Sequence, residues 1–567
     1  MKRNLLGWRP ISLALAVGAG ACDTTTTPPP PPPTPVTGSP CAPADTVTLA
    51  PLQGITLDCS AGTVVTLRGN GASYLVVPQF ATGGDSIPYV TQPFVLGRHG
   101  DHPPISAAAR APGPVRVRHD GAQLAFDRKL RRADRRLVAM AHDASRRSRV
   151  SAAAKAPPVI GSTRTFRVVG DTGGTTVKTV SAALKYAGAN LYVYVDVASP
   201  ANGFTDAQLA GFGQVSDQVL YPLVLNTFGP PSDLDQDGHV TMLLTPEVNS
   251  ITPAADCSTQ GFVAGFFDGI DLTDDPSGNG GEIFYALVPD PTGTASCTHT
   301  VADVLNAIPS TMLHEIQHMV NFGQHVLVHG GDAEDGWLDE GLSRIAEELG
   351  SRYYEAKFPG TSGRTNPSQL FPDSAQAFIV DKLLDSYDYL TAPDTVSLTL
   401  HSDADDGLDW RAGVWLLMRY LGDLKGEGIF RTLVETGLTG LGNIAAASGQ
   451  SFQTVFGNFS IALFTDSIPG VARTSIPAQY RFQTRNLRQL YQVVYNNTGA
   501  AAGPFPITVF TLPDGGGLDG TMVPGTVVYT GITTPSTSAA VSFQFSTATG
   551  TPFAANMHPQ VNVFRLQ

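Results

Sequence analysis

The sequence is poor in charged residues and has no excess of basic ones. Only 15% of its 567 residues are Asp, Glu, Lys or Arg, and the formal net charge is −13. Nucleic acid is therefore not expected as a partner, because binding its phosphates requires clustered positive charge. Glycine and proline are abundant instead, with 59 and 43 residues, a composition typical of β-rich and loop-rich exported proteins. The length allows about three or four domains, and we expect a monomer.

The N-terminus lacks an apolar run long enough to span a membrane. Its apolar stretch, residues 11–17, lies between basic and small residues, so residues 1–22 are predicted to be a signal peptide. The small residues before Cys22 resemble a bacterial lipoprotein cleavage box, which favours lipidation of Cys22 over ordinary cleavage nearby. Residues 23–40, rich in Thr and Pro, would be a tether. We therefore expect export, either to the bacterial cell envelope through this lipid, the one expected membrane contact, or to the medium after processing.

Cysteine is scarce. Four cysteines remain if Cys22 carries lipid: Cys41, Cys59, Cys257 and Cys297. An even number in an exported chain predicts disulfides, and proximity favours 41–59 and 257–297 among the three pairings. Each would stabilise the fold by roughly 3–4 kcal/mol. The close spacing of a structural zinc site is missing.

The pattern along the chain predicts a multidomain α+β protein. Short alternating runs such as "TVVTL" and "YLVVPQF" predict an N-terminal β-sandwich-like domain over residues 41–118. Similar runs predict a C-terminal β domain over residues 475–567. Residues 160–474 mix strands and helices, and we predict here one domain with a mixed sheet followed by a mainly helical part.

A basic segment, residues 119–159, joins the N-terminal β domain to the domain predicted over residues 160–474. Ten Lys or Arg stand against three Asp between residues 127 and 155. The favoured prediction is a solvated helix. The alternative is an exposed connector that is cut on maturation at its Arg pairs, 131–132, 135–136 and 146–147.

The stretch "TMLHEIQHMV", residues 311–320, contains His-Glu-x-x-His. We expect a helix capped by Ser310 and ended by Gly323, on which His314 and His318 stand one turn apart and can bind one zinc ion. Glu315 between them would be the catalytic base.

A catalytic zinc also needs a third protein ligand. Glu340, in "GWLDEGLSRIAEELG", begins a second helix that can pack against the first, which gives two His and one Glu. The alternative, a solvent-facing acidic helix, suits Glu348 better than Glu340. Glu347 could orient a zinc-bound His by accepting a hydrogen bond from the ring nitrogen that does not bind the metal.

Several blocks, in order, resemble the bacterial hyicolysin-like neutral zinc metallopeptidases over about residues 160–475. They are "FGPPSDLDQDGHVTMLLTPEVN", "GFFDGIDLTDDPSGNGGEIFYALVPD", "HEIQHMVNF" and "WLDEGLSRIAEEL". "WLDEG" also resembles the "WLNEG" block of zinc aminopeptidases, which place Glu somewhat closer to the second His. The resemblance implies a metallopeptidase domain, with His314, His318 and Glu340 as zinc ligands and Glu315 as the base.

The residue that stabilises the oxyanion is left open. In the aminopeptidases this donor is a Tyr in Tyr-x-x-Gly, and the matching block here is "WRAG", which begins with Trp410. Either Trp410 substitutes, or a tyrosine such as Tyr353, Tyr354 or Tyr387 serves.

A second metal candidate is "SDLDQDGHV", with Asp233, Asp235 and Asp237 before Gly238. This is the first half of an EF-hand calcium loop, but the twelfth position holds Leu244 in place of Glu. A partial calcium site and an Asx-rich turn are equally supported.

These observations favour a secreted or surface-tethered zinc endopeptidase of protein or peptide substrates, in which Glu315 assists the attack of zinc-bound water. An aminopeptidase is the alternative among enzymes, but no Gly-x-Met-Glu-Asn-like block is present. A surface binding protein or adhesin with a non-proteolytic zinc site is the alternative from another class. The intact Glu315 argues against it, because zinc binding alone needs no base.

Overall fold

The structure is a computed structural model, and it describes most of the chain after residue 36. The described residues are 37–42, 46–84, 90–98, 104–106, 121–148, 157–171, 176–358, 371, 373–400, 407–498, 503–512 and 516–567. The predicted signal peptide, Cys22 and most of the tether lie outside them. Within these ranges, no helix has both the length and the apolar character needed to cross a membrane.

The strands from the two ends of the chain form one β-sandwich. The first sheet has the order β1 (Thr37–Pro40), β3 (Gly54–Asp58), β18 (Pro559–Arg565), β5 (Ser73–Phe80), β16 (Thr530–Thr533) and β14 (Phe510–Thr511). The second has the order β2 (Thr46–Val47), β4 (Val64–Arg68), β17 (Ala540–Ser546), β6 (Gln92–Arg98), β15 (Gly517–Met522) and β7 (Pro104–Ser106). Side chains of both sheets share one apolar core.

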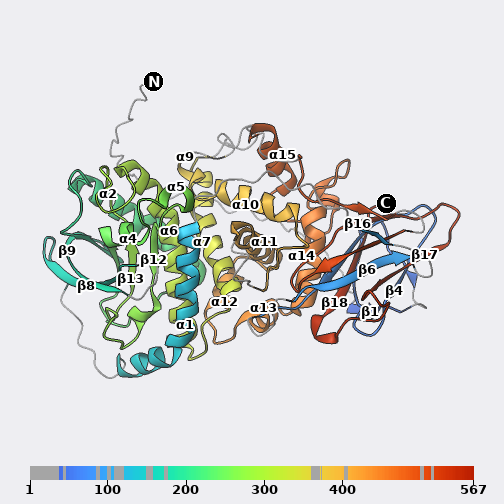
Figure 1. The fold of residues 1–567 in the computed structure, drawn as a ribbon, viewed down its shortest axis with the longest axis horizontal. Coiled ribbons are helices and arrows are strands. Elements are labelled where there is room, and N and C mark those ends of the chain that lie inside the picture. The colour runs from blue at the N-terminus through green and yellow to red at the C-terminus, as the bar shows by residue number, and fades with distance from the viewer. Residues whose placement is uncertain are drawn as a thin grey trace, which may run out of the picture. The chain divides into compact units, whose positions relative to one another are not determined.

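This arrangement differs from the two separate β domains expected from the sequence. In Figure 1 the blue strands β4 and β6 lie beside the red strand β17, and their backbones pair directly. Alternation identifies a strand but not its partner, so strands far apart in sequence could not be matched. The multidomain α+β class is confirmed, with its β domain built from both chain ends.

The central part begins with a mixed sheet. Its order is β12 (Gly265–Phe267), β13 (Ile283–Ala286), β11 (Val240–Leu244), β10 (Leu191–Asp196), β9 (Val177–Ala187) and β8 (Thr163–Val169). β10, β11 and β13 run parallel, whereas β12 is antiparallel to β13. β12 is an edge strand, because its other side pairs with no strand of the described chain.

Helices make up the rest of this part. They are α2 (Asp206–Val215), α3 (Tyr221–Phe228), α4 (Pro246–Ile251), α5 (Cys257–Gln260), α6 (Val301–Phe322), α7 (Gly336–Lys357), α9 (Asp373–Gln376), α10 (Val380–Thr391), α11 (Leu408–Lys425), α12 (Gly428–Val434), α13 (Gly440–Ser448), α14 (Phe452–Thr465) and α15 (Leu487–Thr498). α7 packs between α6 and α11, and α14 packs on the sandwich strands β3, β5 and β18.

The helix that carries the His motif, α6, begins earlier than predicted, and the chain continues past its last residue, Phe322, as a π-helical turn. It begins at Thr300, where a capping box with Asp303 satisfies the first backbone N–H groups. Pro309 therefore lies inside the helix, and Ser310 is not the cap. Gly323 does not end the helical chain either, since it has right-handed helical angles and begins a π-helical turn, Gly323–Val328.

The basic segment forms the helix α1 (Gly121–Ser148), but one face of that helix is buried. Leu124, Phe126, Leu130 and Leu137 are all under 9% exposed and pack on the central part. The prediction of a solvated helix therefore fails for this face. These apolar residues recur at helical spacing and form a stripe along one face of α1. The many arginines between them made the stripe hard to recognise in the sequence.

Both disulfides join the cysteines that proximity favours. Cys41 pairs with Cys59 inside the sandwich core, and Cys257 of α5 pairs with Cys297 just before α6.

Candidate metal centre and active site

Two packed helices bring the three expected metal ligands together. His314 and His318 lie one turn apart on α6, and Glu340 lies in the first turns of α7. The two Nε2 atoms are 3.1 Å apart. Glu340 Oε2 lies 3.5 Å from Nε2 of His314, and its Oε1 lies 3.8 Å from Nε2 of His318. All three side chains are buried, so the cluster is held rigidly by the surrounding core.

Carboxylates hold the far nitrogen of each imidazole. Glu347 Oε1 is 2.8 Å from Nδ1 of His314, and Asp339 Oδ2 is 2.8 Å from Nδ1 of His318. A carboxylate accepts the Nδ1–H, so both Nε2 atoms present lone pairs to the shared space. Glu347 was predicted from the sequence to orient a zinc-bound His, whereas the role of Asp339 was not predicted. Its place directly before Glu340 was the available signal, because that position faces the same helix α6.

This donor set fits a divalent metal ion. Two imidazole lone pairs at 3.1 Å repel each other unless a proton or a metal ion lies between them. Nitrogens bound to one tetrahedral zinc at 2.0–2.1 Å stand roughly 3.3 Å apart, close to the observed separation. Glu340 Oε2 is buried and makes no hydrogen bond within the described chain, so it also lacks a counterpart. Leaving such an oxygen without a partner is costly.

Carboxylates dominate the electrostatic environment of His314. Burial opposes a charge on His314, yet its interactions with Glu340 and Glu347 raise its pKa to about 10. Burial also opposes ionisation of Glu340, but the Arg411 guanidinium and His314 hold its pKa far below the usual range. The field that favours a proton on His314 equally favours a metal cation there.

Glu315, the expected base, stands beside the cluster. Its Oε2 accepts a hydrogen bond from the backbone N–H of Phe267 in β12 at 3.0 Å, and its Oε1 lies 3.9 Å from Nε2 of His314. Burial and the nearby Asp127 carboxylate raise the pKa of Glu315. A carboxylate with a raised pKa is suited to taking and returning a proton near neutral pH.

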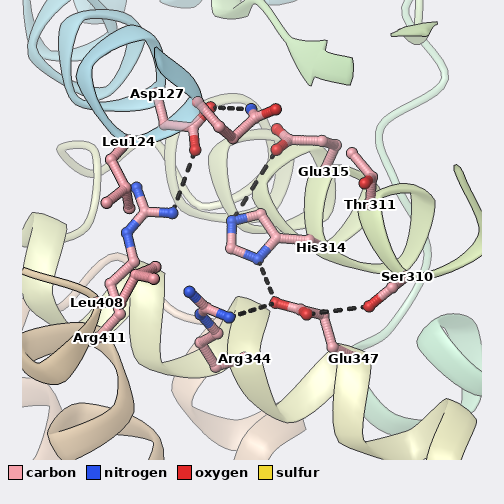
Figure 2. A pocket seen from close by; sticks show the side chains of 11 residues that line it. Leu124, Asp127, Ser310, Thr311, His314, Glu315, Arg344, Glu347, Leu408 and Arg411 are labelled. Carbon is pink, nitrogen blue, oxygen red and sulfur yellow. Dashed lines mark hydrogen bonds and ion pairs between the residues drawn. The ribbon is translucent and has the colours of Figure 1, made fainter. Parts of the chain in front are cut away.

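A cavity of about 160 Å³ opens onto these groups. Figure 2 shows Asp127 and Leu124 of α1, Ser310, Thr311, His314 and Glu315 of α6, Arg344 and Glu347 of α7, and Leu408 and Arg411 around it. Arg411 Nη2 lies 2.9 Å from Glu340 Oε1, and its Nη1 lies 3.1 Å from Asp127 Oδ2.

The cavity wall contains Arg411 and not Trp410, the residue that the Tyr-x-x-Gly comparison suggested. Trp410 is buried but does not line this cavity, and neither do Tyr353, Tyr354 or Tyr387. Trp410 and Arg411 point about 100° apart on α11, and Arg411 is the one of the two that lines the cavity. Arg411 was not predicted because the Tyr of Tyr-x-x-Gly corresponds to position 410.

The acidic loop forms a second cluster that differs in part from the expected one. Carboxylate oxygens of Asp233, Asp235 and Glu282 lie within 4.8 Å of one another, whereas Asp237 is not in this group. Asp237 Oδ1 accepts instead from the backbone N–H of His239 at 2.8 Å.

The fold and the buried His–His–Glu cluster define a candidate metal site of the type found in metallohydrolases. No family model matches the chain. Over 170 residues, 30% of its length, the chain is 35% identical to a protein from Staphylococcus hyicus, the neutral metalloprotease ShpI. The match spans 36% of that relative, so about a third of its length is represented here. Over this stretch the chain is similar to a metalloprotease, which supports a hydrolase of the protease class.

Proposed function

We propose that the protein is a zinc-dependent endopeptidase that cleaves proteins or peptides. The observation that carries this proposal is the meeting of His314, His318 and Glu340 around one point, with Glu315 beside them on the cavity wall. Two His and one Glu, with one position left open, are the ligands of catalytic zinc in several peptidases. The similarity to a neutral metalloprotease supports the same class.

Zinc, when bound, acts as a Lewis acid toward a substrate carbonyl and acidifies a water molecule. Glu315 takes the proton of the attacking water and returns it to the leaving amine. The N–H of Phe267 holds Oε2 of Glu315 and so fixes the carboxylate for both transfers. Glu347 and Asp339 keep His314 and His318 in the tautomer that presents Nε2.

Arg411 is our candidate for stabilising the negative charge that develops on the carbonyl oxygen. Its guanidinium is buried, lines the cavity and bonds Glu340 through Nη2, so its position is fixed before substrate arrives. Preorganised donors of this kind contribute about 3–4 kcal/mol to the transition state. The other guanidinium nitrogen, Nη1, faces Asp127.

An endopeptidase fits the cavity better than an aminopeptidase. An aminopeptidase needs a carboxylate available for the substrate's free amine. Among the described residues, three carboxylates line the cavity: Glu315, Glu347 and Asp127. Glu315 already binds the N–H of Phe267 and Glu347 the ring of His314, and Asp127 pairs with Arg411.

We also propose that the protein acts as a monomer outside the cytoplasm, with a lipid on Cys22 as its membrane contact. The two disulfides support an oxidising compartment. Mass analysis of the N-terminal peptide from the native envelope tests this proposal. A diacylglycerol-modified Cys22 is expected, and an unmodified N-terminus would contradict it.

The function is tested with the full-length protein and its Glu315→Gln variant. Metal content is measured by mass spectrometry, and cleavage is measured on casein and on a quenched peptide library. We expect about one zinc per chain in both proteins and cleavage by the wild type alone. Absence of zinc from both proteins would contradict the site, and equal cleavage by both would contradict the role of Glu315.

A further inference from the structure

Helix α1 lies across the proposed active site. Leu124 and Asp127 of this helix line the same cavity as His314 and Glu315, as Figure 2 shows. Ligand atoms of Asp127, His314 and Glu315 lie within 4.8 Å of one another. The Asp127 carboxylate therefore lies beside Glu315, at the cavity that a substrate of this base would enter.

Side chains of α1 also occupy the edge of the neighbouring sheet. Gln123 Oε1 accepts from the N–H of Ala264 at 2.8 Å, and its Nε2 donates to the carbonyl of Gly265 at 2.9 Å. Arg131 Nη2 donates to the carbonyl of Phe267 at 2.6 Å. These backbone groups belong to β12 or directly precede it, on the edge that no described strand pairs.

An exposed strand edge binds an extended peptide by adding it as a further strand. β12 is suited to this because Glu315 is hydrogen-bonded to Phe267, which places the end of the strand next to the base. Apolar packing holds α1 over this edge. Phe126 contacts Phe266 with ring centroids 5.0 Å apart, and the Arg131 guanidinium lies 5.4 Å from the Phe267 ring centre.

We propose that the edge of β12 is the binding site for the substrate backbone and that α1 is an inhibitory segment that occupies it. This inference rests on the proposed peptidase function. The substrate it implies is an extended polypeptide, which takes the hydrogen bonds now made by Gln123 and Arg131. Displacing α1 also frees Arg411 Nη1 from Asp127.

The test compares the full-length zinc-loaded protein with the Gln123→Ala/Arg131→Ala variant. Loss of these three hydrogen bonds should raise kcat/KM on a quenched peptide about tenfold or more. Arg136→Ala is the matched control, because Arg136 is an exposed residue of the same helix, and it should leave kcat/KM unchanged. Gln123→Ala alone is a milder second variant, in case the double variant folds poorly.

Hydrogen–deuterium exchange gives a readout that does not depend on activity. A peptide hydroxamate should raise exchange across residues 121–148 of the wild type, while β8 stays unchanged. If α1 is released in the variant and kcat/KM does not rise, the inhibitory role is overturned although the peptidase function stands. If the hydroxamate binds without raising exchange in α1, the shared site is also overturned. If α1 is released but no protein cleaves any peptide, the peptidase function fails while the covering of β12 stands.

A different observation carries a second inference, at the acidic loop before β11. Glu282 is 3% exposed, and its Oε1 accepts from Ser232 Oγ at 2.6 Å and from the N–H of Leu234 at 2.9 Å. Its Oε2 is also buried but makes no hydrogen bond within the described chain, and the carboxylate lies in the cluster with Asp233 and Asp235. Burying a carboxylate oxygen without a partner is costly, and a bound cation would remove this cost.

The loop turns tightly between Asp233 and Gly238. Gln236 and Gly238 have φ of 57° and 72°, and the N–H of Gly238 donates to Asp233 at 3.1 Å. Glu282, which precedes β13, replaces the glutamate that an EF-hand loop would supply where this chain has Leu244. We infer that Asp233, Asp235 and Glu282 bind calcium, because all the donors are hard oxygens.

Calorimetric titration of the full-length, zinc-saturated protein with calcium tests this site. One calcium per chain is expected, with affinity lost at least tenfold in Glu282→Gln and in Asp233→Asn. Asp233 lies at the loop surface, so the second variant should fold even if the first does not. Magnesium should bind more weakly, because it requires stricter octahedral geometry. No heat with calcium, or equal binding by the variants, would overturn the inference.

Discussion

Glu347 and Glu348 are adjacent buried carboxylates whose replacement should have different consequences. Glu347 holds Nδ1 of His314 at 2.8 Å and also pairs with Lys382. Glu348 faces away from the metal site, where its Oε1 binds Arg485 Nε and its Oε2 binds Trp415 Nε1. Both are in α7, and both have a pKa below the usual range: burial opposes this shift, but the cationic partners outweigh it.

Glu347→Gln should weaken zinc binding about 10–100-fold, or about 1.4–2.7 kcal/mol, since loss of a carboxylate behind a metal-bound His has effects of this size. It should also destabilise the fold, because the ammonium of Lys382, 3% exposed at its side chain, loses its partner. Breaking such a buried pair costs about 3–5 kcal/mol. Glu348→Gln should cost a similar amount of stability, through Arg485, without changing zinc affinity.

The assay is competition for zinc with a chromophoric chelator, alongside calorimetric unfolding of the zinc-free proteins. The account expects both variants to unfold at lower temperature and only Glu347→Gln to release zinc more readily. Equal zinc affinities in the two variants would refute the claim that Glu347 orients His314. A loss of zinc in Glu348→Gln would show that general loosening of α7, and not the contact at Nδ1, controls the site.

Further predictions concern the second carboxylate, a disulfide and a buried acid. Asp339→Asn should weaken zinc binding about tenfold through His318, measured by the same competition; unchanged affinity would contradict this. Replacing Cys257 and Cys297, which are separated by 40 positions, with Ser should lower the free energy of unfolding by about 4 kcal/mol in denaturant titrations. A loss below 1 kcal/mol would exclude this stabilisation. Burial raises the pKa of Glu334 from 4.5 to about 8, so the folded state holds this proton more tightly than the unfolded chain. Stability should therefore fall as pH rises from about 5 to 8, and Glu334→Gln should remove this part of the slope; identical slopes would contradict it.

The local features of the site could be predicted because they depend on short spacings. The one-turn separation of His314 and His318 follows from helical geometry, and so does the placement of Glu347 two turns after Glu340. The strands that precede the motif helix, such as β8 and β10, were also predictable from alternation. These patterns repeat within a few residues and need no knowledge of partners.

Features set by long-range packing could not be predicted. β4 pairs with β17 about 475 residues later, and the sequence of neither strand identifies its partner. Glu348 was expected to suit a solvent-facing position, yet it is fully buried because Arg485 and Trp415 supply partners from distant segments. Likewise, Glu282 lies 38 positions after Leu244, the place where an EF-hand would provide its ligand.

The surroundings of helix α1 at the active site also could not be predicted from the sequence. Its many arginines predict a solvated helix, but Arg131 is buried against Asp134 and the carbonyl of Phe267. An arginine can be buried where a carboxylate and a backbone carbonyl lie next to its guanidinium, so charge count alone does not indicate exposure. Only the folded position of β12 shows which backbone groups Gln123 contacts.

The most direct test of the metal centre is anomalous diffraction at the zinc absorption edge from crystals of the zinc-loaded, full-length protein. The account predicts a peak bounded by Nε2 of His314, Nε2 of His318 and the carboxylate of Glu340, with Glu315 beside it and not bound. A peak at any other place, or none between these three side chains, would contradict the assignment of the site.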